Sequence, residues 1–278
     1  MKSGTISILG CGWLGVPLAR HLLENGFTVK GSVTSTEKFD LLQNAGIQPY
    51  KIVLNEKLAE VDDSTFFDCD VLIISMPPRR IPDIENVFPA QITGLIPLIL
   101  KSDIQKVIFI SSTSVYPENL QTASESDELL PDKSSGKALV IAENLFKSRT
   151  DFKTTIIRFG GLIGADRNPA HFLLKSGQTV LNTPVNLIHQ DDCIGIINAI
   201  IEQGLWGETL NACCPEHPLK KDFYGKAAQI SGLPEPSISN GPEAFKIIDS
   251  SKLIRLLNYQ FKYQSPMDYL DSLKSIQK

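Results

Sequence analysis

The sequence has few cysteines, and their spacing suits neither a metal site nor a disulfide framework. Five cysteines are scattered among 278 residues, and no two of them form a Cys-x-x-Cys pair. An odd number of such cysteines predicts free, mostly buried thiols in a reducing compartment. We therefore expect a cytoplasmic protein without a metal site. The adjacent Cys213 and Cys214 leave a redox role as the lesser alternative.

Long hydrophobic runs and a surplus of charge are also missing. The longest apolar run, residues 92–100, contains Thr93, Gly94 and Pro97, and it is too short to span a bilayer. The chain enters its first predicted strand without the apolar stretch and cleavage site of a signal peptide. Its 27 basic residues nearly balance its 31 acidic ones, and no stretch concentrates Lys and Arg. These absences argue against a membrane or a nucleic acid as the main partner.

What the chain does contain is a glycine turn directly after its first predicted strand. Residues 5–9 favour a strand and residues 16–23 a helix, and Gly10-x-Gly12-x-x-Gly15 stands between them. In this context the first glycine allows a tight turn, and the second lets the backbone approach a pyrophosphate. The third lets the helix pack on the strand, and the amides at the helix start bind phosphate. The sequence therefore predicts a dinucleotide-binding turn, with a purely structural turn as the alternative.

Strand and helix signals alternate along the first 200 residues. Strands are predicted at residues 28–33, 49–54, 70–75, 106–111 and 154–159, and helices at 13–25, 37–44, 84–101 and 137–147. The continuous apolar runs at 70–75 and 106–111 are typical of parallel strands covered on both faces. This alternation predicts an α/β fold, a Rossmann-type doubly wound parallel sheet.

The last third of the chain loses this alternation. Six prolines between residues 215 and 266 separate short helical pieces such as 221–230 and 251–257. That composition predicts a smaller, mainly helical C-terminal lobe that binds the substrate. We predict a Rossmann domain formed by residues 1–160 and 185–213, and a substrate lobe formed by residues 161–184 and 214–278.

The end of the second predicted strand bears on the choice of cofactor. An NAD-binding site usually carries an acidic residue there, which binds the 2′-hydroxyl of the ribose. Here Thr34, Ser35 and Thr36 follow the strand, and Glu37 and Lys38 come after them. Hydroxyls and a lysine suit a 2′-phosphate, so we predict NADP. NAD stays open because Glu37 is close, and the hydroxyls could simply cap the next helix.

Several motifs give nearly the whole chain a resemblance to a known family. They are the glycine turn, Ser111-Ser112-Thr113-Ser114-Val115-Tyr116-Pro117, the Arg-Phe-Gly-Gly-Leu-Ile-Gly segment at 158–164, His-Gln-Asp-Asp-Cys at 189–193 and Leu-Asn-Ala at 210–212. With these motifs the chain resembles the extended short-chain dehydrogenase/reductases, the NAD(P)-dependent epimerase/dehydratase group. The resemblance implies an oxidoreductase or epimerase in which Ser112 hydrogen-bonds the hydroxyl or carbonyl of the substrate.

The family also uses a Tyr-x-x-x-Lys motif on the following helix, in which Tyr transfers the proton and Lys holds the nicotinamide ribose. If Lys137 is the family lysine, the tyrosine position holds Lys133. If Ala142-Glu143 is the family's later Ala-Glu pair, the tyrosine position holds Ser135 and the lysine position Leu139. Neither alignment supplies a tyrosine. The chain therefore resembles the atypical, tyrosine-lacking branch of the family.

The family's other catalytic groups have candidates in this chain. Thr113-Ser114 stands where sugar dehydratases carry Asp-Glu, so water elimination is not expected. Tyr116 is the nearest substitute for the missing tyrosine, although its ring could merely pack beneath the loop. The predicted catalytic residues are Ser112, Tyr116 and Lys137; the cofactor residues are Gly10, Gly12, Trp13, Leu14, Gly15, Thr34, Ser35, Met76, Pro77, Ser111 and Gly160; and the substrate residues are Thr113 and Arg167.

Two hypotheses about function follow. The first is an NAD(P)-dependent oxidoreductase or epimerase-like enzyme that acts on a small hydroxylated substrate, for example a nucleotide sugar. The second is a non-catalytic protein that senses NADP(H), which the missing tyrosine favours. The predicted partners are the small-molecule substrate and, as one option, a second copy of the chain in a homodimer. Because function does not follow from the fold, the site has to decide between the two hypotheses.

Overall fold

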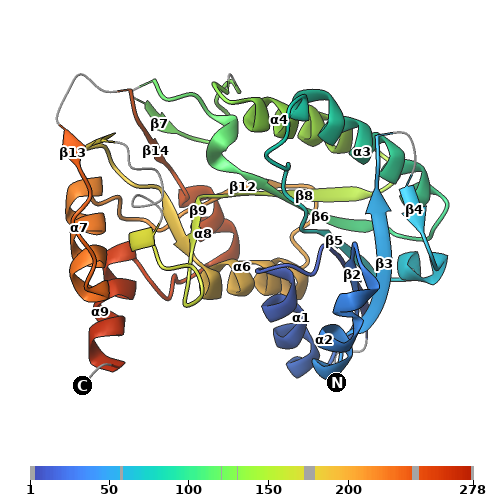
Figure 1. The fold of residues 1–278 in the computed structure, drawn as a ribbon. Coiled ribbons are helices and arrows are strands. Elements are labelled where there is room, and N and C mark those ends of the chain that lie inside the picture. The colour runs from blue at the N-terminus through green and yellow to red at the C-terminus, as the bar shows by residue number, and fades with distance from the viewer. Residues whose placement is uncertain are drawn as a thin grey trace. The chain divides into compact units, whose positions relative to one another are not determined.

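The computed structural model describes residues 4–56, 59–119, 121–129, 131–171, 179–239 and 244–276. An eight-stranded sheet has the strand order β12-β8-β6-β5-β1-β2-β3-β4 (Figure 1). Its strands are β1 (Thr5–Leu9), β2 (Thr28–Val33), β3 (Gln48–Leu54), β4 (Ala59–Val61), β5 (Val71–Ile74), β6 (Lys106–Ser112), β8 (Lys153–Phe159) and β12 (Thr209–Ala212). The helices are α1 (Gly15–Glu24), α2 (Phe39–Asn44), α3 (Ile84–Leu100), α4 (Ser134–Lys147), α6 (Gln190–Gln203), α7 (Lys220–Ser231), α8 (Ser251–Leu257) and α9 (Pro266–Ile276).

The sheet confirms the predicted Rossmann-type fold. Strand β1 pairs in parallel with β2 and with β5, β5 pairs in parallel with β6, and β2 pairs in parallel with β3. The pairing of β3 with the short β4 is antiparallel. Chain order and spatial order differ at β1, where the sheet continues to β2 on one side and to β5 on the other. Ligands in sheets of this kind bind at such a reversal, beyond the carboxyl ends of the strands.

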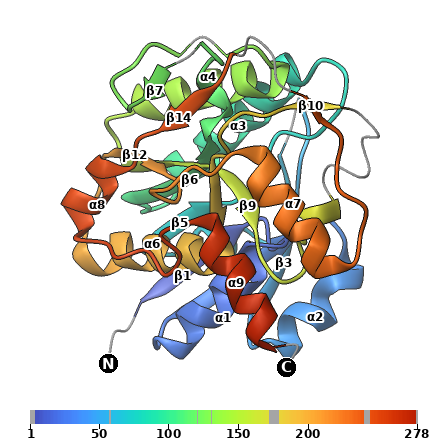
Figure 2. The same cartoon turned by 90° about the vertical axis from the view of Figure 1, so that its left-hand side faces the viewer.

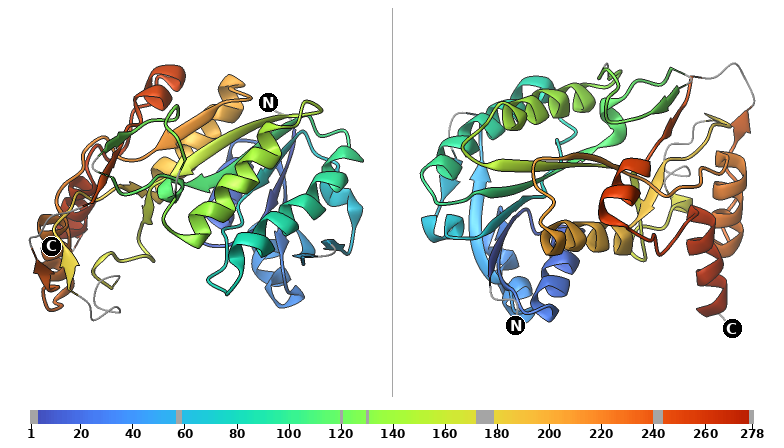
Figure 3. Two further views of the ribbon diagram at one scale, coloured as in Figure 1. Left: turned by 90° about the horizontal axis from the view of Figure 1, so that it is seen from above. Right: turned by 180° about the vertical axis from the view of Figure 1, so that it is seen from behind.

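Helices cover both faces of the strands around β1. Figures 1 and 2 show α3 and α4 on one face and α1 and α2 on the opposite face. Figure 3 shows α3 and α4 lying side by side, and the two helices are in contact along their length. Since both faces are covered, every residue of β5 is buried and β1 is buried from Ile6 to Leu9. This explains why the strands are nearly continuous apolar runs in the sequence.

The chain forms two compact units. Unit 1 comprises residues 1–115, 130–158 and 200–209, and unit 2 comprises residues 116–129, 159–199 and 210–278. Residues 116–129, 159–160, 185–199 and 210–213, which are predicted to be part of the Rossmann domain, belong to unit 2. Among the described residues, no helix is long and apolar enough to span a bilayer.

Unit 2 contains short parallel strand pairs that lie outside the strands predicted from the sequence. Strand β7 (Gln121–Ala123) pairs with β14 (Lys246–Ile248), β9 (Gly161–Ile163) pairs with β11 (Leu187–His189), and β10 (Val180–Leu181) pairs with β13 (Ile238–Ser239). Figure 2 shows β7 beside β14, and α7 near α9. Strands of two or three residues carry no periodic pattern, so the sequence could not reveal them. The core of this unit includes Phe223, Tyr224, Tyr269 and Leu270.

A buried carboxylate fastens the segment between α8 and α9. Asp192 accepts hydrogen bonds from the backbone N–H groups of Lys262 at 2.7 Å and Tyr263 at 3.2 Å, and from the Tyr259 hydroxyl at 3.2 Å. Burial raises the pKa of Asp192, although these hydrogen bonds oppose the shift. The carboxylate thus provides hydrogen-bond acceptors for two backbone N–H groups that lie outside any helix or strand.

Candidate nucleotide-binding site

The turn after β1 needs glycine at two of its three glycine positions for steric reasons. Gly10 has φ +105°, and a Cβ there would lie 2.8 Å from the Ser75 carbonyl oxygen. A Cβ on Gly15 would collide with the carbonyl of Gly10. At Gly12, by contrast, a Cβ would meet no atom within 4 Å, so this backbone faces open space. The geometry matches a tight turn that leaves its middle glycine accessible to a ligand.

Ser32 on β2 fixes this turn with both its side chain and its main chain. The Gly10 N–H donates to Ser32 Oγ at 3.0 Å, and the Cys11 N–H donates to the Ser32 carbonyl at 2.8 Å. Because Ser32 is buried, these bonds are protected from water. Sequence reasoning did not single out Ser32, since a small polar residue in a strand gives no signal of such a contact.

Cys11 is a packing residue of the turn. A Cβ on Gly31 would lie 2.6 Å from Cys11 Sγ, so the glycine in β2 makes room for the sulfur. Burial raises the pKa of the Cys11 thiol to about 12, against the opposing backbone hydrogen bond from Ser32. The thiol is therefore protonated at neutral pH and is not a nucleophile.

The first turn of α1 has the features of an anion site. Leu14 stands at the N-cap and forms no side-chain cap hydrogen bond, and the first turn contains no acidic residue. Amides at a helix start lack partners within the helix and carry the positive end of its dipole. Leu14 itself is buried and Trp13 half-buried. Because the Leu14 side chain is buried, a cofactor contact of this residue would have to use its backbone, and the roles of both residues stay predictions.

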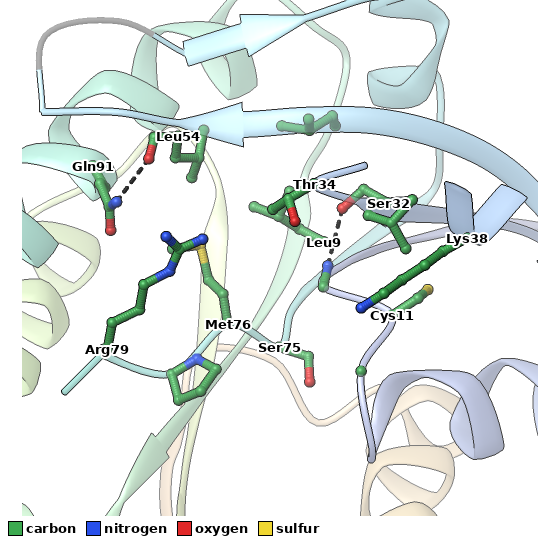
Figure 4. Close-up of a pocket in the computed structure, with 15 residues that line it drawn as sticks. Leu9, Cys11, Ser32, Thr34, Lys38, Leu54, Ser75, Met76, Arg79 and Gln91 are labelled. Carbon is green, nitrogen blue, oxygen red and sulfur yellow. Dashed lines mark hydrogen bonds between the residues drawn. The ribbon is translucent and has the colours of Figure 1, made fainter. Parts of the chain in front are cut away.

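A pocket of about 290 Å³ opens beyond the carboxyl ends of β1, β2, β3 and β5 (Figure 4). Its apolar walls include Leu9, Val33, Ile52 and Leu54. Of the predicted cofactor residues, Gly10, Gly12, Thr34, Met76 and Pro77 line it. Predicted Ser35 does not line it; its Oγ accepts the Glu37 N–H at 3.4 Å and caps the short 3₁₀ turn Thr36–Lys38, and its role in cofactor binding stays a prediction.

Two cations line the pocket, and sequence reasoning missed one of them. Figure 4 shows Lys38, in the 3₁₀ turn after β2, reaching toward the glycine turn, and Arg79 on the opposite side. Within the described part of the chain, neither side chain has a hydrogen bond or ion pair. Gln91, also missed, donates from Nε2 to the Leu54 carbonyl at 2.7 Å. No carboxylate lines the pocket among the described residues. The pocket is therefore suited to an anionic ligand with an apolar part.

At the end of β6, two neighbouring serines have different hydrogen-bond partners. Ser111 is buried, and its hydroxyl donates to Glu143 Oε1 at 2.7 Å. Ser112 is half-buried, and its Oγ accepts the Ser114 N–H at 3.1 Å. A hydroxyl that accepts one hydrogen bond still has its own proton to donate. Thr113, the predicted substrate residue beside them, is buried.

A buried ion pair lies behind this loop. Arg158 on β8 binds the Glu143 carboxylate through Nε at 3.0 Å and through a terminal nitrogen at 2.6 Å, and both side chains are at most 1% exposed. Burial alone would raise the pKa of Glu143, but hydrogen bonds and charge from Arg158, with help from Ser111 and Lys147, lower it. Glu143 is thus ionised and fully engaged, and it orients Ser111.

Helix α4 contains no tyrosine. Of the two candidate tyrosine positions, Lys133 is the N-cap residue and Ser135 lies in the first turn. Predicted Lys137 is exposed, and its ammonium lies 3.5 Å from Glu85 Oε1 on α3. A hydrogen bond from Ser134 is the main cause that lowers the pKa of Glu85, and Lys137 contributes to the shift.

The remaining predicted residues belong to unit 2. Tyr116 is 1% exposed; its hydroxyl donates to Asn211 Oδ1 at 2.8 Å, and its carbonyl accepts from Lys246 at 2.8 Å. Gly160 is closely packed, because a Cβ there would lie 2.8 Å from a backbone carbonyl. Arg167 is exposed, in the turn that follows β9. The predicted roles of these three residues in binding and catalysis stay predictions.

Comparison with known proteins gives the class. Residues 5–129 match the NAD-binding domain of 6-phosphogluconate dehydrogenase. UDP-glucuronic acid 4-epimerase from Bacillus cereus, solved with UDP-glucuronic acid and NAD, is 21% identical with a TM-score of 0.77, over 98% of this chain and 99% of that one. A short-chain dehydrogenase/reductase superfamily protein from Agrobacterium tumefaciens with bound NAD is 17% identical with a TM-score of 0.77, over 98% and 97%.

The fold and the site therefore define a protein with an NAD-binding Rossmann domain and the fold of the extended short-chain dehydrogenase/reductases, as the sequence resemblance implies. Protein YeeZ of Escherichia coli (strain K12) is 32% identical over 266 residues, which cover 94% of this chain and 97% of the relative. The chain belongs to the YeeZ family.

Proposed function

We propose that the protein binds NADP(H) and acts as an oxidoreductase or epimerase-like enzyme on a small hydroxylated substrate. The observation that carries the cofactor choice is the pocket at the end of β2, which Thr34 and Lys38 line and to which no described carboxylate contributes. An NAD site would use an acidic residue there to bind the 2′-hydroxyl. The Thr34 hydroxyl and the Lys38 ammonium, which have no hydrogen bond or ion pair to a described residue, instead match a 2′-phosphate.

In this proposal the glycine turn and the start of α1 bind the pyrophosphate. The open space over Gly12 and the lack of a carboxylate in the first helical turn support this placement. The ribose of the adenosine half then lies by Thr34 and Lys38, and Met76 and Pro77 flank it. The nicotinamide ring supplies hydride chemistry when bound.

Ser112 is the proposed group that orients the reacting oxygen of the substrate. Its proton remains available because its recorded hydrogen bond, with the Ser114 N–H, uses only an acceptor site. Oxidation of an alcohol also removes a proton from this oxygen. Tyr116 could take part only by breaking its bond to Asn211, so we propose that water carries the proton and that Tyr116 holds the backbone of the loop.

The proposal about the substrate rests on the fold and on two polar residues, Arg167 and Thr113. Solved proteins with this fold include epimerases, one of them in complex with UDP-glucuronic acid, which supports a nucleotide sugar here. Arg167 could bind a phosphate or carboxylate of such a substrate through two parallel hydrogen bonds. We propose Arg167 and Thr113 as substrate residues.

Two observations favour the second candidate function, a sensor of NADP(H) without turnover. Helix α4 offers no tyrosine, and Lys137 lies in an ion pair with Glu85. A site without a proton-transfer group could bind the nucleotide and still catalyse nothing.

The cofactor proposal is tested by titrating the protein with NADPH and NADH, following nicotinamide fluorescence and the melting temperature. We expect tighter binding of NADPH. Lys38→Met should weaken NADPH about ten- to a hundredfold and leave NADH unchanged, because a charge-assisted hydrogen bond is lost. Lys101→Met, which removes an exposed charge outside the pocket, is the control. Equal affinities for both nucleotides in the wild type would contradict the proposal.

Turnover is tested with a panel of nucleotide sugars and the NADP-loaded protein, by following reduced-nicotinamide fluorescence and product formation. Ser112→Ala should reduce the rate at least tenfold without changing NADPH affinity. Ser148→Ala, at the exposed end of α4, should act as the wild type. Binding of NADPH without turnover of any substrate would favour the sensor.

A further inference from the structure

A second cavity, of about 360 Å³, lies within unit 2. It is lined by the end of α7, by α9 and by the segment that follows β9, and Figure 2 shows α7 beside α9. Neither Arg167 nor Thr113, the two proposed substrate residues, is among the described residues that line it. A cavity of this volume can hold a small molecule.

Tyr269, on α9, lines this cavity with a hydroxyl group that the protein leaves unused. The residue is 4% exposed, and its hydroxyl has no hydrogen bond to any described residue. The oxygen is not one of the fully buried polar atoms without a partner, so it faces the cavity. The ring packs against His189 and Tyr263, with centroids 4.5 and 5.7 Å apart, which fixes its position. A polar group in such a place is usually bound by a ligand or by water.

Asn168 and Ser231 add a second hydroxyl proton to the cavity lining. The Asn168 amide donates from Nδ2 to Ser231 Oγ at 2.9 Å, and its Oδ1 accepts the Ala170 N–H at 2.9 Å. These two bonds fix the orientation of the amide. Because Ser231 Oγ is the acceptor in this pair, its own proton is left to donate, and no described residue accepts it.

The charges around the cavity disfavour an anion. The described residues that line it include no carboxylate, lysine or arginine, and His171, which does line it, is exposed to water. Burial raises the pKa of Tyr269, so its hydroxyl keeps its proton, and the charges of Asp191 and Asp166 act in the same direction. Ser231 is the last residue of α7, where the helix dipole is negative. A cation, in turn, would offer no acceptor to the two hydroxyl protons.

We propose that this cavity is a binding site for a small uncharged ligand that carries a carbonyl oxygen on an apolar ring or short chain. The hydroxyl groups of Tyr269 and Ser231 donate to the oxygen of the ligand. The side chains of Ile230, Leu233 and Leu273 contact its apolar part. The site does not depend on the proposed binding of NADP(H), because its described lining belongs to unit 2, whereas the glycine turn belongs to unit 1.

Three aromatic probes of similar shape and different charge test the proposal: acetophenone, benzoate and benzylammonium. Each is titrated into the whole chain and followed by ¹H–¹⁵N NMR correlation spectra. Acetophenone should bind with a Kd of about one millimolar, as expected for so small a ligand, and should shift the amide signals of Ile230, Ser231 and Leu233. Benzoate and benzylammonium should bind at least about tenfold more weakly, because neither satisfies the donors without burying a charge.

Tyr269→Phe removes the hydroxyl and keeps the ring. It should weaken acetophenone about three- to tenfold, because one hydrogen bond to the ligand is lost. Its melting temperature should equal that of the wild type, because the hydroxyl has no described partner in the free protein. Tyr224→Phe is the matched control, since Tyr224 is a buried tyrosine of the same core that does not line the cavity. This variant should bind acetophenone as the wild type does.

The proposal is overturned if none of the probes binds, or if either charged probe binds as tightly as acetophenone. Wild-type affinity for acetophenone in Tyr269→Phe would also overturn it. Shifts confined to the amides of residues 10–15 would place the probe at the glycine turn and refute the site in unit 2. A protein that binds acetophenone as expected but no dinucleotide would contradict the proposed function alone.

Discussion

Ser111 and Ser112 are adjacent on β6, and side chains of successive strand residues point to opposite faces of the sheet. Ser111 therefore meets α4, where its hydroxyl donates to Glu143, while Ser112 is turned the other way and accepts the Ser114 N–H. The first serine joins the loop to a buried ion pair, and the second keeps a proton for a ligand. A change at Ser111 would thus act on the site through Glu143.

The Glu143–Arg158 pair is the most deeply buried ionic contact in unit 1 for which both side chains are described. Burial of two charges costs several kcal/mol, which good geometry and additional hydrogen bonds offset. Here Arg158 binds the carboxylate with two nitrogens, and Ser111 and Lys147 add a hydrogen bond each. Removing one partner leaves the other charged and buried, so the pair is far more sensitive to mutation than its net stabilisation suggests.

Glu143→Gln should lower the free energy of unfolding at pH 7 by about 3–5 kcal/mol, because Arg158 loses its counter-charge. The folded-state pKa of Glu143 lies below its ordinary value of 4.5. Its contribution is therefore complete above about pH 4.5 and is lost as pH falls through the folded-state pKa. Urea melts from pH 7 to pH 3 should show the variant and wild type converging in acid. Lys147→Met, which removes an exposed partner, should change stability by less than about 1 kcal/mol. A constant difference at all pH values would contradict this.

Single residues of the site were predictable only where a local pattern specifies them. Gly10 and Gly15 follow from the turn between strand and helix, and the structure shows the close contacts that exclude a side chain. Gln91 could not be predicted, because its partner Leu54 is 37 positions away and a glutamine on a helix is ordinarily a solvated residue. Arg79 was missed for a similar reason, since an arginine after two prolines looks like an exposed loop residue.

Helices α3 and α4 lie on the same face of the sheet but tolerate side chains very differently. Gly136, in the first turn of α4, packs so closely that a Cβ would collide with the Ser114 carbonyl and lie 2.7 Å from Pro131. Gly94, inside α3, has nothing within 4 Å of the corresponding position. The start of α4 is thus fitted against Ser114, in the turn that follows Ser112 and β6, whereas α3 has space at Gly94.

The same substitution should therefore have opposite effects on the two helices. Gly136→Ala should destabilise the protein by about 1–3 kcal/mol, because the helix or the loop must shift. Gly94→Ala should stabilise it by about 0.5–1 kcal/mol, because alanine loses less backbone entropy in a helix. Thermal melts at a fixed pH measure both. A stable Gly136→Ala variant with unchanged NADPH binding would show that the contact is not restrictive.

At the scale of single helices and strands, the sequence predicts the longer ones well. The strand at 28–33 and the helix at 251–257 have the predicted bounds, and the helix predicted at 84–101 is α3, Ile84–Leu100. These elements have enough residues for periodicity or a continuous apolar run to show. The pairs β7–β14 and β10–β13 join segments far apart in the chain through two or three residues each. Their pairing depends on tertiary packing, which no local window contains.

At the scale of the whole molecule, the main feature is the path of the chain between the two units. It passes from one unit to the other five times, near residues 115, 129, 158, 199 and 209. The segment 200–209 returns to unit 1 and is fastened there by Thr155 on β8. Thr155 Oγ1 donates to the Leu205 carbonyl at 2.8 Å and accepts the Gly207 N–H at 3.1 Å. One buried hydroxyl thus satisfies both a donor and an acceptor of the returning segment.

Two neighbouring threonines test this attachment. Thr155→Val should lower the free energy of unfolding by about 2–4 kcal/mol, since a carbonyl and an N–H lose their partner. Thr154 is the matched control, because its buried Oγ1 has no hydrogen-bond partner among the described residues. Thr154→Val should be neutral or slightly stabilising, since it removes an unsatisfied polar atom without changing the shape. Equal losses in the two variants, measured by urea denaturation, would contradict the assignment.

The five crossings of the chain also constrain how this gene can evolve. Neither unit is encoded by one continuous stretch, so a single recombination event between relatives cannot exchange one unit as a block. A crossover between residues 155 and 205, for example, would carry parts of both units into the hybrid and mismatch the contacts of Thr155 with residues 205–207. New specificities in this lineage are therefore expected to arise by point changes and loop insertions rather than by shuffling of modules.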